Sequence, residues 1–476
     1  MDYSQFLNMI PEATLMLALV IVFFADFALH KSERKQFVLS VLTGALLVCQ
    51  LVPCLLAEPA TAFGGLYVTT PIVNVMKVIL TAGTLIVVIM SQEWLRTIRY
   101  QGEFHMLVIS TLLGMYMMMS SGHFLLFFLG LEMASVPMAC LVAFDKMKQQ
   151  SAEAAAKYIL TATFSSGVML YGISFLYGAV GTLYFDDMAA QISATPLTIM
   201  GMVFFFSGLG FKISLVPFHF WTADTYQGAP TPITGYLSVV SKGAATLTLA
   251  IILMKVFGSM VDYWEPLLYI VIVLSITVAN LFAIRQKELK RFMAFSSISQ
   301  AGYIMLAVVG NSAAGLAALT FYVLVYVVAN MSVFTVISAV EHNGGSTQMS
   351  AYNGFYKTNP KLSLLMTFAL FSLGGIPPFA GMFSKFFVFM AGVGGHESAP
   401  FWPYFVVFIA LVNTVVSLYY YLLIVKAMYI TKEDNPLPTF RNAPSVNLSL
   451  ALCTVGILLF GVCSCIYEWI AQAAAM

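Results

Sequence analysis

Apolar stretches of about twenty residues follow one another along almost the whole chain, each long enough for a helix to cross a bilayer. Fourteen can be delimited, near residues 12–29, 37–57, 71–92, 104–121, 122–144, 151–179, 197–219, 231–256, 264–284, 292–309, 312–340, 361–391, 402–430 and 446–472. Only 9% of the residues are charged, whereas soluble domains carry about 25%. The sequence therefore predicts an all-α, polytopic membrane protein with about fourteen transmembrane helices, surrounded by lipid.

The basic residues indicate how these helices are oriented. Of the 22 lysines and arginines, sixteen lie in or at the edges of alternate loops, whereas the other loops and both termini hold only Lys255. Loops rich in lysine and arginine stay on the cytoplasmic side. We therefore expect both termini on the outer side. The net charge of +1 gives no sign of a nucleic-acid partner.

Prolines and glycines interrupt the predicted helices in two places. They are Pro217, Pro230 and Pro232 around the seventh and eighth spans, and Gly374, Gly375, Pro377 and Pro378 in the twelfth. Proline removes a backbone donor, and in lipid the freed carbonyls need another partner, so broken helices tend to line polar cavities. Each break carries a lysine, Lys212 or Lys385. This suggests that a five-helix unit, spans four to eight, is repeated in spans nine to thirteen.

Away from the ends of the predicted spans lie five lysines and one glutamate: Lys77, Glu132, Lys157, Lys212, Lys242 and Lys385. A charge at mid-bilayer costs roughly 3 kcal/mol on insertion scales, so each is a candidate for function. Lys212 and Lys242 lie too deep to reach the interface easily, and Lys385 follows the second break. Glu132 could be a helix-end carboxylate that reaches water, but the apolar residues on both sides favour function. For Lys157, nearer the cytoplasmic end of its span, function and simple snorkelling both stay open. Lys77 is expected to snorkel to the outer interface.

Proton transfer is the chemistry that these residue types suggest. Desolvation favours loss of the lysine proton, and a nearby carboxylate opposes that loss. A buried lysine whose carboxylate partner approaches or retreats can therefore take up and release a proton. Glu132 and Lys212 are suited to such a pair, with Lys242 and Lys385 as further stations. The groups that could bridge gaps between them, along with water, are Ser241, Tyr236 and His219.

The segment around His219 and Asp224 lies at the cytoplasmic end of the seventh span, where interfacial anchoring and proton uptake are both open. The sequence shows no acidic triad for a metal, no P-loop, no dinucleotide-binding glycine turn and no haem attachment motif. We therefore expect no cofactor and no metal in this chain. If it serves an oxidoreductase, another subunit performs the electron chemistry.

Several long stretches resemble the antiporter-like membrane subunits of respiratory complex I, the NADH-quinone oxidoreductase, and most closely those of the N type. They are LFFLGLEMASVP, SAEAAAKYIL, GLGFKISLVPFHFWTADTYQGAPTPITGYLSVVSKGA, KELKRFMAFSSISQAGYIM and SLGGIPPFAGMFSKFFVF, spread over about residues 104–430. L-type subunits carry a long C-terminal lateral helix, and M-type subunits usually have a glutamate in place of Lys385. Chain length and Lys385 together favour the N type.

The resemblance implies fourteen helices with two inverted five-helix repeats. The expected division is an N-terminal three-helix segment (1–103), a first antiporter-like repeat (104–258), a second (259–430) and a C-terminal helix (431–476). The resemblance also implies proton transfer through Glu132, Lys157, Lys212, Lys242 and Lys385, driven by quinone reduction elsewhere in the complex. NADH, flavin, iron–sulfur clusters and quinone would belong to partner subunits, and homologous antiporter-like subunits would be neighbours in a bacterial inner membrane, with both termini periplasmic.

Two alternatives remain. The chain could belong to a multisubunit sodium/proton antiporter or a membrane-bound hydrogenase, whose large subunits are members of the same superfamily. It could also be a membrane scaffold with fixed ion pairs, because buried pairs can serve specificity rather than transport.

Overall fold

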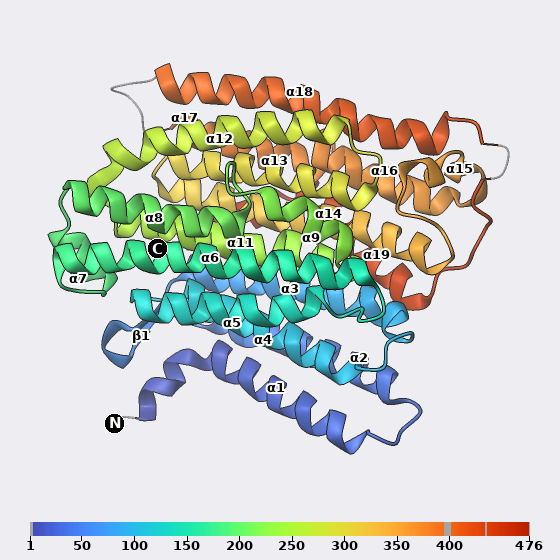
Figure 1. The fold of residues 1–476 in the computed structure, drawn as a ribbon, viewed down its shortest axis with the longest axis horizontal. Helices are drawn as coiled ribbons and strands as arrows, with labels where there is room; N and C mark the ends of the chain where they lie inside the picture. Colours follow the sequence, from blue (N-terminus) through green and yellow to red (C-terminus); the bar gives the residue numbers. More distant parts are fainter. Residues whose placement is uncertain (1–2, 395–400, 434–435, 476) are drawn as a thin grey trace.

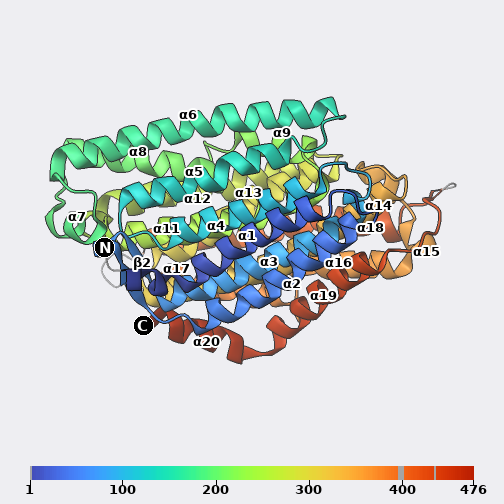
Figure 2. The same ribbon diagram turned by 90° about the horizontal axis from the view of Figure 1, so that it is seen from below.

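The computed structural model describes residues 3–394, 401–433 and 436–475. Long helices run side by side along the longest axis of the molecule, and both ends of the chain lie toward the same end of the bundle (Figures 1 and 2). This arrangement agrees with an even number of crossings.

The N-terminal segment consists of three long helices and a short hairpin. A 3-10 turn (Tyr3–Met9) leads into α1 (Ile10–Ala28), which is followed by α2 (Lys35–Leu56) and α3 (Pro71–Leu95). Between α2 and α3, strands β1 (Ala60–Ala62) and β2 (Tyr67–Thr69) pair antiparallel, with Ala60 opposite Thr69. The hairpin lies at the end of the bundle near the N-terminus (Figures 1 and 2).

The next group of helices contains the first break. It comprises α4 (Gln101–Met119), α5 (Phe124–Val142), α6 (Gln149–Val180), the short α7 (Phe185–Gln191), α8 (Pro196–Ile213), α9 (Phe220–Gly228), α10 (Thr231–Tyr236) and α11 (Lys242–Lys255). A π-helical turn, Leu237–Ser241, joins α10 to α11 without interrupting the rod.

The remaining helices contain the second break. They are α12 (Val261–Ile284), α13 (Leu289–Val309), α14 (Ala313–His342), the one-turn α15 (Phe355–Thr358), α16 (Pro360–Gly374), α17 (Ala380–Val393), α18 (Phe401–Tyr429), α19 (Pro444–Val462) and α20 (Ser464–Ala475). The last expected span, 446–472, is divided at Cys463 between α19 and α20.

Thirteen helices in the described residues are long and apolar enough to cross a membrane. The expected twelfth span is covered by two shorter apolar helices, α16 and α17, on either side of the predicted break. The prediction of an all-α membrane protein with about fourteen spans, including broken ones, is therefore confirmed.

Both breaks have the same local design. The helix before each break ends at a residue in the left-handed region, Ser214 after α8 (φ 69°) and Gly375 after α16 (φ 84°). A proline follows within three residues, and its missing N–H prevents the helix from continuing. At the first break the Trp221 indole donates to the Phe211 carbonyl at 2.9 Å. The freed backbone is thus satisfied inside the protein, as a low-dielectric surrounding requires.

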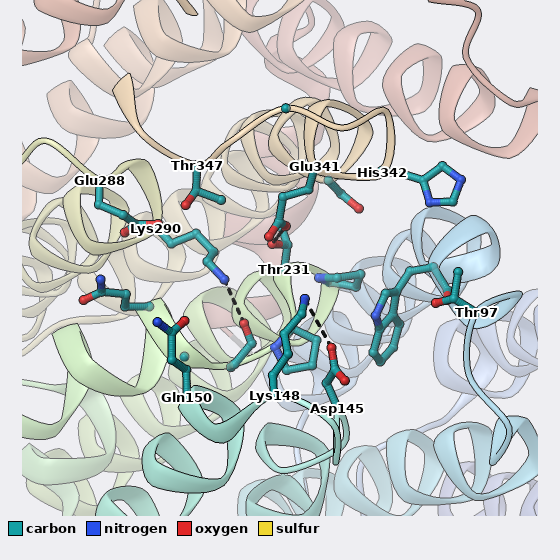
Figure 3. Close-up of a pocket in the computed structure, with 18 of the residues that line it drawn as sticks. Thr97, Asp145, Lys148, Gln150, Thr231, Glu288, Lys290, Glu341, His342 and Thr347 are labelled. Atoms are coloured by element: carbon teal, nitrogen blue, oxygen red, sulfur yellow. Dashed lines mark hydrogen bonds and ion pairs between the residues drawn. The ribbon is translucent and has the colours of Figure 1, made fainter. Parts of the chain in front are cut away.

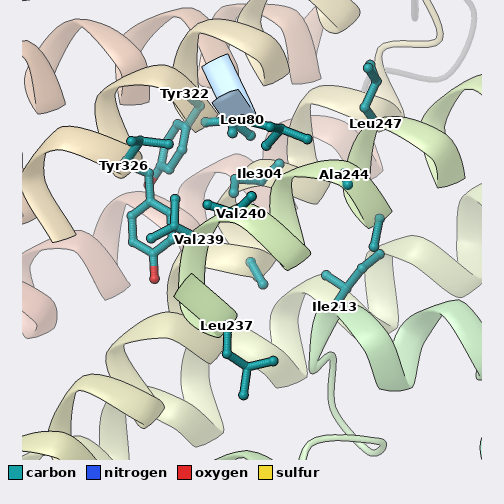
Figure 4. Close-up of a cluster of buried hydrophobic side chains, with 14 of the residues drawn as sticks. Leu80, Ile213, Leu237, Val239, Val240, Ala244, Leu247, Ile304, Tyr322 and Tyr326 are labelled. Carbon is teal, nitrogen blue, oxygen red and sulfur yellow. The ribbon is translucent and has the colours of Figure 1, made fainter. Parts of the chain in front are cut away.

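The centre of the bundle is formed by α11, α13 and α14, whereas α1, α6 and α18 are peripheral and expose large apolar side chains. Figure 4 shows apolar residues of the π-helical turn and α11, including Val239, Val240 and Ala244, near Leu80, Ile304 and Tyr322. This central packing positions Lys242, which follows the π-helical turn directly.

Two glycines allow α4 and α5 to approach closely. A Cβ built on Gly114 would lie 2.4 Å from the Ala134 backbone nitrogen, and one on Gly130 would lie 2.4 Å from that of Met118. Small residues at such contacts are the usual basis of helix packing in membranes.

We expect Gly114→Ala to lower the thermal stability of the purified protein, because the methyl group would press on backbone that cannot move aside. Overpacking of this kind costs about 1–3 kcal/mol. Gly167→Ala on α6 is the matched control, since a Cβ there meets nothing within 4 Å. Equal melting temperatures for the two variants in detergent would contradict this account of the α4–α5 contact.

Candidate functional site

Lys212 lies in the last turn of α8, just before the first break, and is buried. Its ammonium group donates to the Ser135 hydroxyl at 2.8 Å and to the Tyr158 hydroxyl at 3.2 Å. Glu132 lies one turn before Ser135 on α5, is only half-buried, and is close enough to interact electrostatically with Lys212. The structure thus brings the expected pair near one another without direct contact, and Ser135, one turn after Glu132 on α5, is the residue that binds Lys212.

Lys242 lies at the centre of the bundle and is buried. Its ammonium group donates to the hydroxyl of Ser297 on α13, and it lies 5.7 Å from the centre of the Tyr226 ring. The Tyr226 hydroxyl is 3.3 Å from the same Ser297 oxygen. The Lys242 ammonium group is therefore bound by the Ser297 hydroxyl and lies over an aromatic ring.

Lys385 lies in α17, beyond the second break, and is also buried. Its ammonium group donates to the Gly374 carbonyl at 3.2 Å, an acceptor exposed by the break, and lies 5.0 Å from the centre of the Tyr303 ring. Beside it is a cavity of about 10 Å³, close to the smallest volume that holds one water. Polar groups on its wall come from Gln300, Tyr322, Tyr326, Ser372, Ser384 and Lys385.

None of these three lysines forms an ion pair within the described part of the chain. They differ in this respect from Lys157, whose side chain is 46% exposed and whose ammonium group pairs with Glu153 at 2.8 Å and Asp224 at 2.9 Å. Asp224 also binds Arg291 at 2.7 Å. The structure thus separates a surface cluster at Lys157 and Asp224 from the buried lysines.

Two tyrosines of α14 that were not predicted as site residues, Tyr322 and Tyr326, line the cavity beside Lys385. Tyr326 also lies close to Ser297, the partner of Lys242, but its buried hydroxyl forms no hydrogen bond within the described residues. Tyr322 donates to Gln300, which in turn donates to the Tyr421 hydroxyl at 3.1 Å. The spacing of Tyr322 and Tyr326 by four residues, on one face of an apolar helix, was a sequence signal that could have identified them.

Of the expected bridging groups, His219 and Ser241 are buried, and the His219 Nδ1 and Ser241 Oγ atoms have no partner in the described part of the chain. Tyr236 points toward α4, where its hydroxyl donates to the Val108 carbonyl at 3.2 Å and lies 2.7 Å from Thr111. It therefore does not touch the buried lysines directly.

A cavity of about 610 Å³ opens on the side of the basic loops (Figure 3). It lies beside Ala229–Pro232, the proline-containing segment between α9 and α10. Lys290 donates to the Ala229 carbonyl at 3.0 Å, and Thr231 donates to Glu341. The other charged or titratable wall residues are Asp145, Lys148, Glu288 and His342. The cavity brings charged groups to the break before α10, the helix that leads to Lys242.

Lys77 does not snorkel, so that expectation is wrong. Its side chain is fully buried and forms an ion pair at 2.7 Å with Glu12 of α1, which is 2% exposed. Glu12 lies at the edge of the first predicted span, where the sequence alone suggests an ordinary helix-end carboxylate. A partner 65 positions away in sequence cannot be identified without the fold.

In the described residues, no group of three or more histidines, cysteines and acidic residues is placed to hold a metal ion. The fold and the site together define the class of protein: an antiporter-like membrane subunit with two broken helices and buried lysines. The family model described as NADH:quinone oxidoreductase/Mrp antiporter, TM, matches residues 121–417.

Full-length relatives are more specific. NADH-quinone oxidoreductase subunit N of Phocaeicola vulgatus is 56% identical, with 100% of each chain covered, and that of Azobacteroides pseudotrichonymphae is 48% identical, covering 99% of this chain and 98% of the relative. A chain of respiratory complex I from Thermus thermophilus with bound aureothin is 31% identical, with a TM-score of 0.79, covering 95% of this chain and 97% of that one. The chain belongs to the NADH-quinone oxidoreductase subunit N family.

The fold is shared more widely than the sequence. A chain of the Mrp complex from a Dietzia species has a TM-score of 0.84 at 20% identity, and covers 98% of this chain and 97% of that one. At this identity the likeness shows the fold alone.

Asp224→Asn tests whether the surface cluster contributes to the stability of the structural core. Partly exposed ion pairs contribute about 0–1 kcal/mol, so we expect a small change in thermal unfolding in detergent, despite the loss of an anion shared by Lys157 and Arg291. A loss of several kcal/mol would show instead that Asp224 is part of the structural core.

Proposed function

We propose that this chain is the proton-translocating, non-redox membrane subunit of a bacterial NADH-quinone oxidoreductase. The observation that carries the proposal is the set of three buried lysines, Lys212, Lys242 and Lys385, whose ammonium groups rest on hydroxyls, a carbonyl and aromatic rings. A fixed structural cation would be expected to have a carboxylate partner, because a buried, unpaired charge is costly. A lysine that is neutral for part of a cycle avoids this cost.

The route runs along the bundle centre. Glu132 acts on Lys212 through space, so a change of charge at either group changes the proton affinity of the other. Ser297 accepts a hydrogen bond from Lys242, and Tyr326 lines the cavity beside Lys385; hydroxyl groups such as these can both accept and donate a proton. His219 is a bridging candidate between Lys212 and Lys242. Protons are taken up from the cytoplasm through the 610 Å³ cavity at the break before α10, and Lys157 with Asp224 forms a neighbouring surface cluster.

The domain division follows from the two breaks. Residues 104–258 and 259–430 form two inverted repeats, each with one broken helix, between the 1–103 segment and the C-terminal part, 431–476. The alternation of basic loops supports a cytoplasmic face for the 285–291 loop and a periplasmic face for both termini. The plasma membrane is the expected location.

Electron chemistry belongs to other subunits in this proposal. The relatives are named as subunits of an NADH-quinone oxidoreductase, which supports partners that carry NADH, flavin, iron–sulfur clusters and quinone. The complex I structure supports homologous membrane subunits as lateral neighbours. Quinone reduction in those partners drives the protons through this chain.

A sodium/proton antiporter complex is the second candidate, supported by the shared fold and by a family model that also covers Mrp antiporters. The subunits that co-purify in mild detergent separate the two: iron–sulfur and quinone-site subunits support the first, and a set without redox subunits supports the second.

We expect Lys242→Ala, Lys212→Ala and Glu132→Ala each to cause a several-fold fall in proton uptake driven by NADH in membrane vesicles, with the complex still assembled on a native gel. Each removes a group that must bind a proton or set a neighbour's proton affinity. Lys31→Ala, at an exposed loop lysine, is the control and should pump normally. Normal pumping by assembled Lys242→Ala would reject the proton-station assignment.

Cysteine labelling tests the orientation. Lys255 and Lys287 are both exposed. Lys255 ends α11 and Lys287 lies between α12 and α13, so the two residues lie at opposite ends of α12. In intact cells, an impermeant thiol reagent should label Lys255→Cys and spare Lys287→Cys, in a background where the exposed native cysteines are replaced. The reverse pattern would place the termini in the cytoplasm.

A further inference from the structure

The Glu12–Lys77 ion pair lies outside the axis of the three buried lysines and has its own polar surroundings. The Tyr67 hydroxyl of β2 donates to Glu12 at 2.9 Å and accepts from Lys77 at 3.3 Å. The Ser120 hydroxyl donates to the other Glu12 oxygen at 3.4 Å. The ion pair is thus held between α1, α3, the hairpin and the end of α4.

A row of buried hydroxyls leads inward from the pair. Thr81 and Thr84 lie one and two turns after Lys77 on the same face of α3, and both are fully buried. Tyr116 of α4 contacts Thr81 and donates to the Lys77 carbonyl at 3.2 Å. Thr84 lies near the Tyr236 hydroxyl, and its own hydroxyl donates to the Leu80 carbonyl at 2.7 Å. Tyr236 ends α10, and the π-helical turn that follows it presents Lys242.

The other side of the pair faces the end of the bundle. Ser120 begins the short link between α4 and α5, and β2 is hydrogen-bonded to this link through Val68 N–H and the Ser120 carbonyl, at 2.9 Å. Glu12 is therefore one hydroxyl away from a connecting segment at the end of the bundle that bears the hairpin. This is the end opposite the 610 Å³ cavity.

Stability alone does not account for the pair. Two charges taken out of water lose much of their solvation, and apolar residues of the same volume often stabilise a protein as well or better. The titratable groups that face the pair are Tyr67, Tyr116 and Cys54, so no second carboxylate or amine competes for its charge within the described contacts.

We propose that Glu12 and Lys77 form a proton-exchange site from which protons leave this chain on the side of the termini. A proton arriving along the α3 row binds the Glu12 carboxylate, which becomes neutral and loses its attraction to the Lys77 ammonium. The proton then leaves through the Ser120 hydroxyl to water, and the ion pair forms again. One proton enters and one leaves per cycle. The site rests on the proposed proton-translocating function and names its outlet.

The test removes both charges together, because a single substitution would leave an unpaired buried charge and could prevent folding. Glu12→Gln with Lys77→Met is compared with Asp186→Asn with Lys255→Met, which removes an exposed lysine–carboxylate pair of the same 2.7 Å length. Both are measured in the native complex in membrane vesicles, as protons moved per NADH oxidised, with the amount of assembled complex as a second reading. We expect the control to match the unmodified complex, and the buried double variant to fall to the ratio of Lys242→Ala.

The outcomes separate the two proposals. An unchanged ratio in the assembled double variant, with Lys242→Ala lowered, would mean that the Glu12–Lys77 pair is structural while the translocating function stands. An unchanged ratio in Lys242→Ala as well would reject both. If the double variant does not assemble, Ser120→Ala decides, since it keeps both charges and removes the outlet hydroxyl: a lowered ratio supports the site and an unchanged one overturns it.

Discussion

The cost of holding lysine charges away from water is the constraint on which the rest of this structure depends. Lys212, Lys242 and Lys385 are buried in helices whose outer faces are apolar. Each needs polar atoms near its ammonium group, and the surrounding helices supply them as the hydroxyls of Ser135, Tyr158 and Ser297 or as a backbone carbonyl. The central helices α13 and α14 accordingly bury several hydroxyl side chains: Ser296, Ser297, Ser299, Tyr303, Thr320, Tyr322, Tyr326, Ser332 and Thr335.

The helix breaks also help to stabilise the buried lysine charges. A continuous helix uses its carbonyls internally, so it has few acceptors to offer a buried cation. At the second break the Gly374 carbonyl is released and accepts from Lys385. At the first, Lys212 stands in the final turn of α8, and the indole of Trp221 satisfies the Phe211 carbonyl instead. Irregular backbone is thus placed where charges must be accommodated, and the regular helices around it provide the rigid frame.

The features that sequence could predict are those encoded locally. Spans follow from runs of apolar residues, breaks from prolines, and buried lysines from their position within a span, so Lys212, Lys242 and Lys385 were predicted correctly as buried. Contacts between distant segments could not be predicted, because one sequence does not show which helix faces meet. This is why Lys77 was expected to snorkel rather than bind Glu12, and why Ser297 and Tyr326 were missed. Lys157 was left open, and the structure places it at the surface.

The central claim is that Lys242 must lose its proton during turnover, and not merely be positive. Arginine keeps the charge but stays protonated in proteins, so Lys242→Arg in the assembled complex separates the two roles. The measurement is proton uptake driven by NADH in membrane vesicles, normalised to the amount of complex. The account predicts that Lys242→Arg loses pumping nearly as fully as Lys242→Ala. Full pumping by Lys242→Arg would contradict it and show that Lys242 is a fixed structural cation.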